Sequence, residues 1–158
     1  MEIRRLDFGD ADGVFALVRE MIEERHDALV PGRIKDRRDF SEIFKAKLLG
    51  IMAGDVVDFV AVEDGRIVGE CEIVRQKAGE GVVGILVARE RRRKGIGSML
   101  LRASIDEALR SGISEAYAEV MQSNADAAAF FYREGFRISE RQTASGNGPV
   151  RMYMRIGT

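Results

Sequence analysis

The residues with the clearest chemistry form a basic turn that contains two glycines. An apolar run, Val82–Val87, precedes this turn, and an amphipathic segment, Met99–Ser111, follows it. The pattern predicts a strand, a turn and a helix. A helix N-terminus leaves backbone N–H groups without partners and favours an anion, and glycines allow a close approach to the backbone. The turn, Arg92–Ser98, is therefore a candidate phosphate site, although a solvated strand-to-helix turn is the alternative. The four consecutive cations are Arg91, Arg92, Arg93 and Lys94.

Two common phosphate motifs do not fit this turn. The P-loop requires Gly-Lys followed by Ser or Thr, and the chain has no such sequence. The dinucleotide fingerprint requires a third glycine for close helix packing, where this chain has Leu100. The segments before the turn also alternate like antiparallel strands, which argues against a Rossmann fold.

Composition excludes several other classes of protein. The chain has 158 residues and a formal net charge of −1, so we expect one domain, residues 1–158, and no nucleic-acid partner. No apolar run is long enough to span a membrane, and the start of the chain does not resemble a leader peptide. One cysteine and one histidine provide neither an internal disulfide nor a usual metal cluster. A cytoplasmic location is the default expectation.

The single cysteine and the single histidine are weak candidates for catalysis. Cys71 lies in a β-rich stretch without a histidine beside it in the sequence, so a small buried residue is the favoured interpretation. His26 lies in the polar stretch Arg25–Asp39, which is broken by Pro31-Gly32. Such a stretch is either a solvated loop or a lip of a substrate site, and its excess of cations hints at an acidic substrate.

The elements around the turn predict an α+β protein with a mixed sheet. Asp64-Gly65 is a strong hairpin signal, and it joins two of three consecutive strands that lead into the turn. Ser41 is the predicted cap of the second helix, Gly54 its stop, and Asn124 the cap of the last helix. The predicted strands are Ile3–Leu6, Val56–Glu63, Arg66–Gln76, Val82–Val87, Glu115–Met121, Phe136–Gln142 and Pro149–Ile156. The predicted helices start near Asp10 or Asp12, at Ser41, at Met99 and at Ala125, and the final strands flank a loop, Thr143–Gly148.

This order resembles the GNAT superfamily of N-acetyltransferases over essentially the whole chain. The pyrophosphate turn of that superfamily has the pattern [QR]-x-x-G-x-[GA], which Arg92–Gly97 satisfies. The end of the chain resembles the family tail N-x-x-A-x-x-x-Y-x-x-x-G-F, from Asn124 to Phe136. The closest pattern is that of the ribosomal-protein alanine N-acetyltransferases. Two departures are Arg89, where a proline is common, and Phe131, where the tail has tyrosine.

The resemblance implies a three-layer sandwich, with about seven strands in a mixed, mostly antiparallel sheet and four helices, and acetyl-CoA as cosubstrate. Pantetheine would lie along the fourth strand, at Ile85, Leu86 and Val87, with the Val87 amide as the oxyanion donor. Gly84 fits a bulge that splays this strand from the next. The pyrophosphate would contact the turn, and Asn124 would bond the pantetheine arm. The implied turn residues are Arg92, Arg93, Lys94, Gly95, Ile96, Gly97 and Ser98.

The resemblance also assigns acid–base roles. A free amine must lose a proton before it attacks a thioester, because most amines are protonated at neutral pH. Glu119 matches the carboxylate that acts as the base in the alanine N-acetyltransferase group, and Glu70 and Glu72 are rivals on the third strand. Tyr132 is one place later than the usual general acid, whose position is Phe131. Either Tyr132 serves, or the thiolate leaves without a protein acid.

The predicted function is an acetyl-CoA-dependent transfer of an acetyl group to a primary amine by direct attack in a ternary complex. The acceptor is open between a protein N-terminus, a lysine and a small molecule, which includes the small-amine and antibiotic acetyltransferases. Two other classes remain open, a non-catalytic CoA-binding sensor and a nucleotide-binding domain. Whether the protein forms a homodimer is also open.

Overall fold

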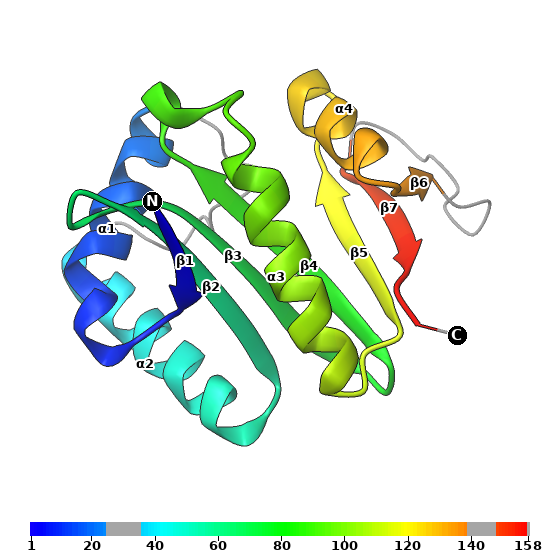
Figure 1. Ribbon diagram of the computed structural model, residues 1–158, viewed down its shortest axis with the longest axis horizontal. Coiled ribbons are helices and arrows are strands. Elements are labelled where there is room, and N and C mark those ends of the chain that lie inside the picture. The colour runs from blue at the N-terminus through cyan, green and yellow to red at the C-terminus, as the bar shows by residue number, and fades with distance from the viewer. Residues whose placement is uncertain (25–35, 139–147, 158) are drawn as a thin grey trace.

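The computed structural model describes residues 1–24, 36–138 and 148–157. One seven-stranded sheet has the strand order β1-β2-β3-β4-β5-β7-β6 (Figure 1). The strands are β1 (Glu2–Arg5), β2 (Val56–Glu63), β3 (Arg66–Lys77), β4 (Glu80–Val87), β5 (Glu115–Val120), β6 (Arg137–Ile138) and β7 (Val150–Arg155). The helices are α1 (Ala11–Glu23), α2 (Arg37–Ala53), α3 (Ile96–Arg110) and α4 (Ala125–Arg133), with 3₁₀ turns η1 (Phe8–Asp10) and η2 (Arg89–Arg91). The predicted α+β class and element order are confirmed.

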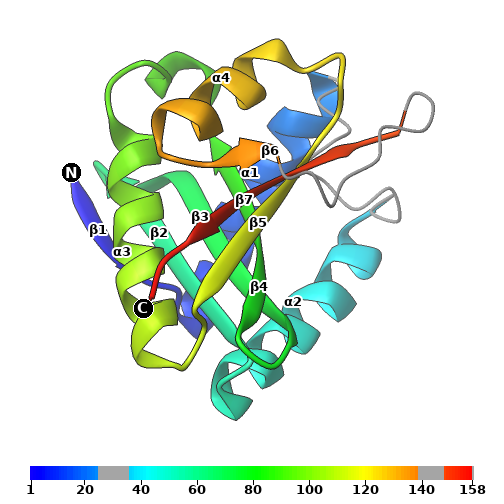
Figure 2. The same ribbon diagram turned by 90° about the vertical axis from the view of Figure 1, so that its right-hand side faces the viewer.

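The helices form layers on both faces of the sheet. Helices α1 and α2 cover one face of β2 to β4, and α3 covers the other (Figure 2). Alternate strand residues point to opposite faces, so the α3 face is apolar and includes the fully buried Cys71 and Ile73. The α1–α2 face carries several charged residues, which include the buried Asp58 and Glu70. Among the described residues, no helix is long and apolar enough to cross a membrane.

The helix boundaries confirm some predicted caps and correct others. Gly54 ends α2 in the left-handed conformation with φ of 81°, and Asn124 caps α4 through its side-chain oxygen. Helix α2 begins earlier than predicted, because Asp36 accepts a hydrogen bond from the Asp39 backbone N–H. Ser41, the predicted cap, lies inside the helix, where its hydroxyl donates to the Arg37 carbonyl. The loop 143–147 and His26 lie outside the described residues.

The sheet separates between β4 and β5. These strands pair in parallel from Glu80 with Glu115 to Val83 with Ala118, and the ladder stops there, one residue before Gly84 and Glu119. The predicted bulge at Gly84 is wrong, because Gly84 pairs in register with Glu72 on β3. The strands therefore diverge without an extra residue, and the separation opens the centre of the sheet toward the β4–α3 turn.

Candidate active site

The separated edge of β4 presents its own backbone to the gap. The Ala88 N–H donates to the Val68 carbonyl at 2.8 Å, which directs it toward β3. Backbone groups alternate in direction along a strand. The N–H groups of Val87 and Ile85 therefore point away from β3, toward the side that β5 has left. An extended amide ligand could add to this edge as an extra strand.

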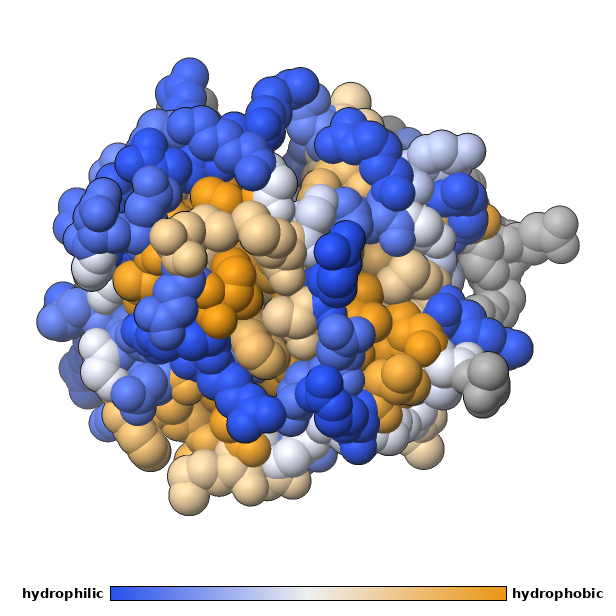
Figure 3. Space-filling view, in the orientation of Figure 1, coloured by the Kyte–Doolittle hydropathy of each residue, from blue (hydrophilic) through white to orange (hydrophobic). Residues whose placement is uncertain are grey.

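The β4–α3 turn directs further backbone groups toward the same gap. Arg93 and Gly95 both have left-handed backbones, with φ of 61° and 82°. Left-handed φ in a non-glycine residue is uncommon and strained, and it often marks a ligand site. Helix α3 starts at Ile96, directly after Gly95, so its first N–H groups emerge beside the turn. Hydrophilic side chains gather over this end of the molecule (Figure 3).

The two glycines have different reasons to be glycine. A Cβ on Gly95 would meet nothing within 4 Å, so its backbone conformation is what favours glycine. A Cβ on Gly97 would lie 3.1 Å from Cε2 of Phe130, which is tighter than nine in ten Cβ contacts in proteins. Gly97 thus permits the close packing of α4 on α3. Besides the predicted close approach of a phosphate, Gly97 therefore has a packing reason to be glycine.

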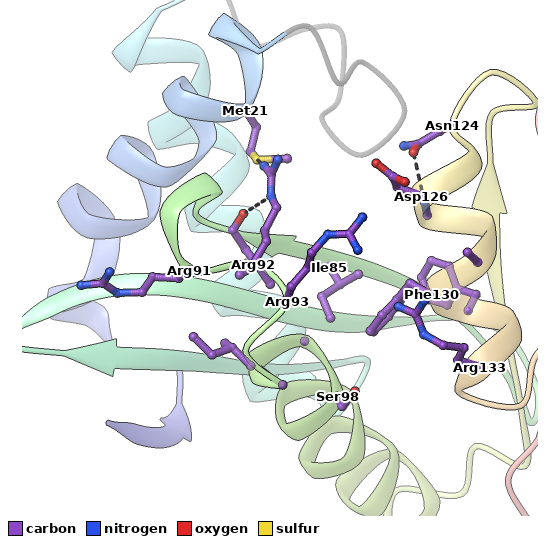
Figure 4. A pocket seen from close by; sticks show the side chains of 17 residues that line it. Met21, Ile85, Arg91, Arg92, Arg93, Ser98, Asn124, Asp126, Phe130 and Arg133 are labelled. Carbon is purple, nitrogen blue, oxygen red and sulfur yellow. Dashed lines mark hydrogen bonds between the residues drawn. The ribbon is translucent and has the colours of Figure 1, made fainter.

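A cavity of about 300 Å³ lies between the turn, the end of β4 and helix α4 (Figure 4). We call it the cofactor cavity. It brings together most of the residues predicted for cofactor binding, and α4 adds residues that the sequence did not single out. The lining from β4 and the turn includes Ile85, Val87, Arg91, Arg92, Arg93, Gly95, Ile96, Gly97 and Ser98; that from α4 and its cap includes Asn124, Asp126, Phe130, Phe131 and Arg133. Leu86 and Lys94 are not among its lining residues.

Two predicted phosphate contacts are partly engaged with protein groups. The Arg92 guanidinium pairs with Glu24 at 2.9 Å and donates to the Val87 carbonyl at 2.9 Å, so it joins the end of α1 to the end of β4. The Ser98 hydroxyl is hydrogen-bonded to Glu134. Arg93 and Arg133 both line the cavity, one from the turn and one from α4. These two cations therefore flank the space in which a phosphate would lie.

Phe131, at the position of the family tyrosine, and Tyr132, one place later, point in different directions from helix α4. Phe131 is 1% exposed and packs edge-on against Phe136, with ring centroids 5.1 Å apart. Tyr132 is 58% exposed, and its ring contacts the Arg137 guanidinium at 3.9 Å from the centroid. Tyr132 does not line the cofactor cavity, and one step along a helix accounts for this rotation of about 100°. The structure therefore does not bring the phenol to the gap.

A second cavity, of about 280 Å³, lies on the opposite side of β4, beneath α1 and α2. We call it the α2 cavity. Its walls are mainly apolar, but Lys47, Glu70 and Glu72 also line it. The apolar and small lining residues are Val14, Val18, Phe40, Ile43, Phe44, Ala46, Val56, Val74, Gly84, Ile85 and Leu86. Ile85 lines both cavities, so the two spaces adjoin at the point where β4 and β5 separate.

The charged group in the α2 cavity is centred on Lys47. Its ammonium lies 3.0 Å from Asp58 and 3.0 Å from Glu72, and it also pairs with Glu70. Burial lowers the pKa of Lys47, but the three carboxylates outweigh this and raise it well above its usual value. Burial and the charge of Glu70 raise the pKa of the Asp58 carboxyl. The three carboxylates lie close enough together to hold a metal ion, and the ammonium of Lys47 lies among them.

The register of the sheet places Glu72 and Glu119 on either side of Gly84. Glu72 pairs with Gly84, and Glu119 follows the last β4–β5 pair, so all three side-chain positions face the α1–α2 side. A Cβ on Gly84 would lie 3.5 Å from Cγ and Oε1 of Glu72. Glu119 is 44% exposed and pairs with Arg151 at 3.1 Å. The predicted base and one of its rivals therefore flank a position that has no side chain.

The sequence contained a signal for the charged group around Lys47, which we did not predict. Lys47 falls on the same helix face as Phe40 and Phe44, which are buried. A cation on a buried stripe needs acidic partners. Asp58 interrupts an otherwise apolar strand in the same way. Cys71 is fully buried, which confirms the prediction of a small buried residue. Burial raises the pKa of its thiol.

Comparison with known proteins gives consistent matches. Residues 18–136 match the model of the Acetyltransferase (GNAT) family. The fold is similar to PaiA N-acetyltransferase from Thermoplasma acidophilum in complex with coenzyme A, with a TM-score of 0.80, 20% identity and 98% of each chain covered. It is also similar to YncA, a putative acetyltransferase from Salmonella typhimurium with acetyl-CoA (TM-score 0.79, 20% identity, 100% and 95% covered). A ribosomal-protein-alanine N-acetyltransferase from Brucella melitensis matches with a TM-score of 0.75, 21% identity and 98% of each chain covered.

Proposed function

This chain belongs to the GNAT family of acetyltransferases, and we propose that it transfers the acetyl group of acetyl-CoA to a primary amine by direct attack in a ternary complex. One observation carries the proposal: Ile85 lines two cavities on opposite sides of the separated strand. A thioester in one cavity and an amine in the other would meet there. Holding two reactants in this way removes about 7–11 kcal/mol of barrier.

The cofactor cavity suits the parts of acetyl-CoA. The backbone of Ile85 and Val87 faces the gap and would pair with the pantetheine amides. The N–H groups from Arg93 to Ser98 would hold the pyrophosphate, as helix N-termini do, with Arg93 and Arg133 beside it. PaiA and YncA, which share the fold, were solved with coenzyme A and acetyl-CoA respectively. The Val87 N–H would then donate to the thioester oxygen as it gains negative charge.

We assign the base to Glu119. The ammonium of the acceptor loses a proton to the Glu119 carboxylate, either directly or through water. The free amine attacks the thioester carbonyl, so that a C–N bond forms as the C–S bond breaks. The nitrogen then loses its second proton to water, and the coenzyme leaves as a thiolate, which takes up a proton from solvent. A thiol is acidic enough for the thiolate to leave without a tyrosine, and Phe131 offers no hydroxyl at the family position.

The second candidate is a CoA-binding sensor without catalysis. Phe131 favours it, because this side chain stands where the family tail has its tyrosine. Both candidates require acetyl-CoA to bind, and they differ only in turnover. A nucleotide-binding domain would use the same turn but would select ATP or NAD.

Calorimetry with acetyl-CoA, ATP and NAD, followed by a thiol-release assay with a panel of primary amines, tests these candidates. We expect acetyl-CoA to bind selectively and at least one amine to support thiol release. Selective binding without turnover of any amine would favour the sensor. We expect Glu119→Gln to lower kcat about 100- to 1,000-fold while acetyl-CoA still binds. An unchanged kcat in this variant would remove Glu119 from the base role.

A further inference from the structure

We infer that the α2 cavity binds the apolar body of the acceptor, and that Glu72 holds the acceptor ammonium over Gly84. The acceptor class is therefore a primary ammonium on a compact apolar body. This inference rests on the proposed function, since it specifies the second substrate of the same reaction.

The first argument is charge. The group around Lys47 contains three carboxylates and one ammonium. Burial and the charge of Glu70 raise the pKa of Asp58, and the other two carboxylates, Glu70 and Glu72, still outnumber the single cation. The walls of the cavity are otherwise apolar, so the excess negative charge is weakly screened. A cationic ligand would balance this charge, whereas an anionic one would be repelled.

The second argument is access. The side chain of Glu72 is 33% exposed, whereas those of Glu70 and Asp58 are 6% and 0% exposed. Glu72 is thus the member of the group that an incoming ammonium can reach. Both carboxylate oxygens of Asp58 are buried and accept no hydrogen bond from the described residues. Asp58 interacts with the group through its ion pair with the ammonium of Lys47. Lys47 therefore acts as a positioning residue that fixes the carboxylate of Glu72.

The third argument is space. Gly84 has no left-handed backbone, and an added Cβ would be in ordinary contact with Glu72. Neither backbone strain nor crowding requires glycine at this position. The missing side chain leaves room between Glu72 on β3 and Glu119 on β5, the strands on either side of β4. An ammonium at this point would contact Glu72, on the face of the sheet toward which Glu119 also points, and would lie next to the β4 edge where the thioester would lie.

The fourth argument is the shape of the remaining cavity. It extends from Gly84 beneath α1 and α2, between Val14, Val18, Phe40 and Phe44. Its volume of about 280 Å³ suits a small aliphatic or aromatic group and excludes a bulky polar one. Each methylene buried here would improve binding about fourfold.

The test compares amines that differ only in their apolar body: ethylamine, 3-methylbutylamine and 2-phenylethylamine. We expect kcat/KM of the wild-type protein to rise at least tenfold along this series. A peptide with an N-terminal phenylalanine carries the same ammonium and body. Whichever of the peptide and the free amine is preferred identifies the source of the acceptor, and either result supports the inference. A flat series would overturn it.

Two variants sharpen the test. Ala46 is exposed and lines the cavity, so Ala46→Phe narrows the cavity without a core substitution. We expect kcat/KM for 2-phenylethylamine to fall about tenfold, with little change for ethylamine. Ala53→Phe is the matched control, since it lies on the same helix, is exposed and does not line the cavity. Equal effects of the two variants would contradict the inference.

Glu72→Gln removes the charge at the proposed ammonium site. We expect KM for the amines to rise about 10- to 100-fold, as for the loss of a hydrogen bond to a charged group, with the Kd for acetyl-CoA unchanged. Lys47→Arg, which retains the charge, should keep the rise in KM below that of Glu72→Gln. Binding of acetyl-CoA without an effect of Glu72→Gln on KM would overturn this inference alone. Loss of acetyl-CoA binding in the wild-type protein would overturn the proposed function instead.

Discussion

The two cavities on either side of β4 are built from different parts of the chain. The cofactor cavity is lined by Val87, whose backbone N–H points away from β3, and by the backbone of the turn before α3. The α2 cavity presents side chains, from Lys47 on α2 and from Glu70 and Glu72 on β3. A backbone site tolerates many side chains as long as the chain keeps its path, whereas a side-chain site changes with each substitution. The comparison explains how one fold can keep a cofactor and change its acceptor.

The largest expected effect is a loss of stability when Lys47 in the α2 cavity is replaced. Lys47→Met would leave three carboxylates together in a mostly buried group, and removing one member of a buried ion pair costs about 3–5 kcal/mol. We expect a loss of this size in the free energy of unfolding, measured with urea. A loss below about 1 kcal/mol would show that the group is solvated, and the contrast between the two cavities would weaken.

The same variant has a pH dependence with a definite sign. Burial and Glu70 already raise the pKa of the Asp58 carboxyl above its usual value, and the ammonium of Lys47 holds it down, so removing the ammonium raises the folded-state pKa of Asp58 further. The folded state then has its full stability below the unfolded pKa of about 4 and loses stability as pH rises through the raised pKa of Asp58. Lys47→Met should therefore be more destabilising at pH 8 than at pH 5. Unfolding curves at both values would measure this, and a loss that is larger at pH 5 would contradict it.

The next effect falls on the backbone site. Val87→Pro removes the N–H that points away from β3, and no N–H that points toward it. Loss of one oxyanion donor lowers kcat about 100- to 1,000-fold. We expect this loss of kcat in the thiol-release assay. The change in the free energy of unfolding should be much smaller than that expected for Lys47→Met. Val87→Ala, which keeps the N–H, is the control and should retain most of kcat.

A smaller effect is expected at Gly95. Its φ of 82° strains any other residue, and Gly95→Ala should cost about 1–2 kcal/mol. We expect about a tenfold increase in the Kd for acetyl-CoA by calorimetry. The matched substitution Gly148→Ala, at a glycine with open space around it, should leave the Kd unchanged. Equal effects on the Kd at the two positions would argue against a role of the left-handed backbone at Gly95 in binding acetyl-CoA.

The smallest effect concerns Tyr132. Its ring lies against Arg137 on the outer side of α4, so Tyr132→Phe should change kcat by less than about twofold. The kcat of the variant across pH 7 to 9 measures this. A tenfold loss would place the phenol at the thiolate and would reverse the assignment made from the structure.

The sequence predicted one of the two cavities and missed most of the other. The turn and the β4 edge are local, so spacing along the chain places Gly95, Val87 and α3 next to one another. The α2 cavity is made by residues such as Lys47 and Glu72, which lie on separate elements. Their approach depends on strand register and helix packing, which no local pattern contains. Tyr132 illustrates the same limit, since one residue of helical rotation decided where it points.

The position of Ile85 has a further consequence for the hydrolysis of acetyl-CoA in the absence of an acceptor. It lines both spaces, so any water that fills the empty α2 cavity lies next to the position proposed for the thioester. We expect the Ile85 side chain to shield the proposed thioester position until an amine displaces that water. A smaller residue there, as in Ile85→Ala, would waste acetyl-CoA by hydrolysis in the absence of an acceptor. We therefore expect Ile85 to affect the coupling ratio, the number of amines acetylated for each thioester consumed.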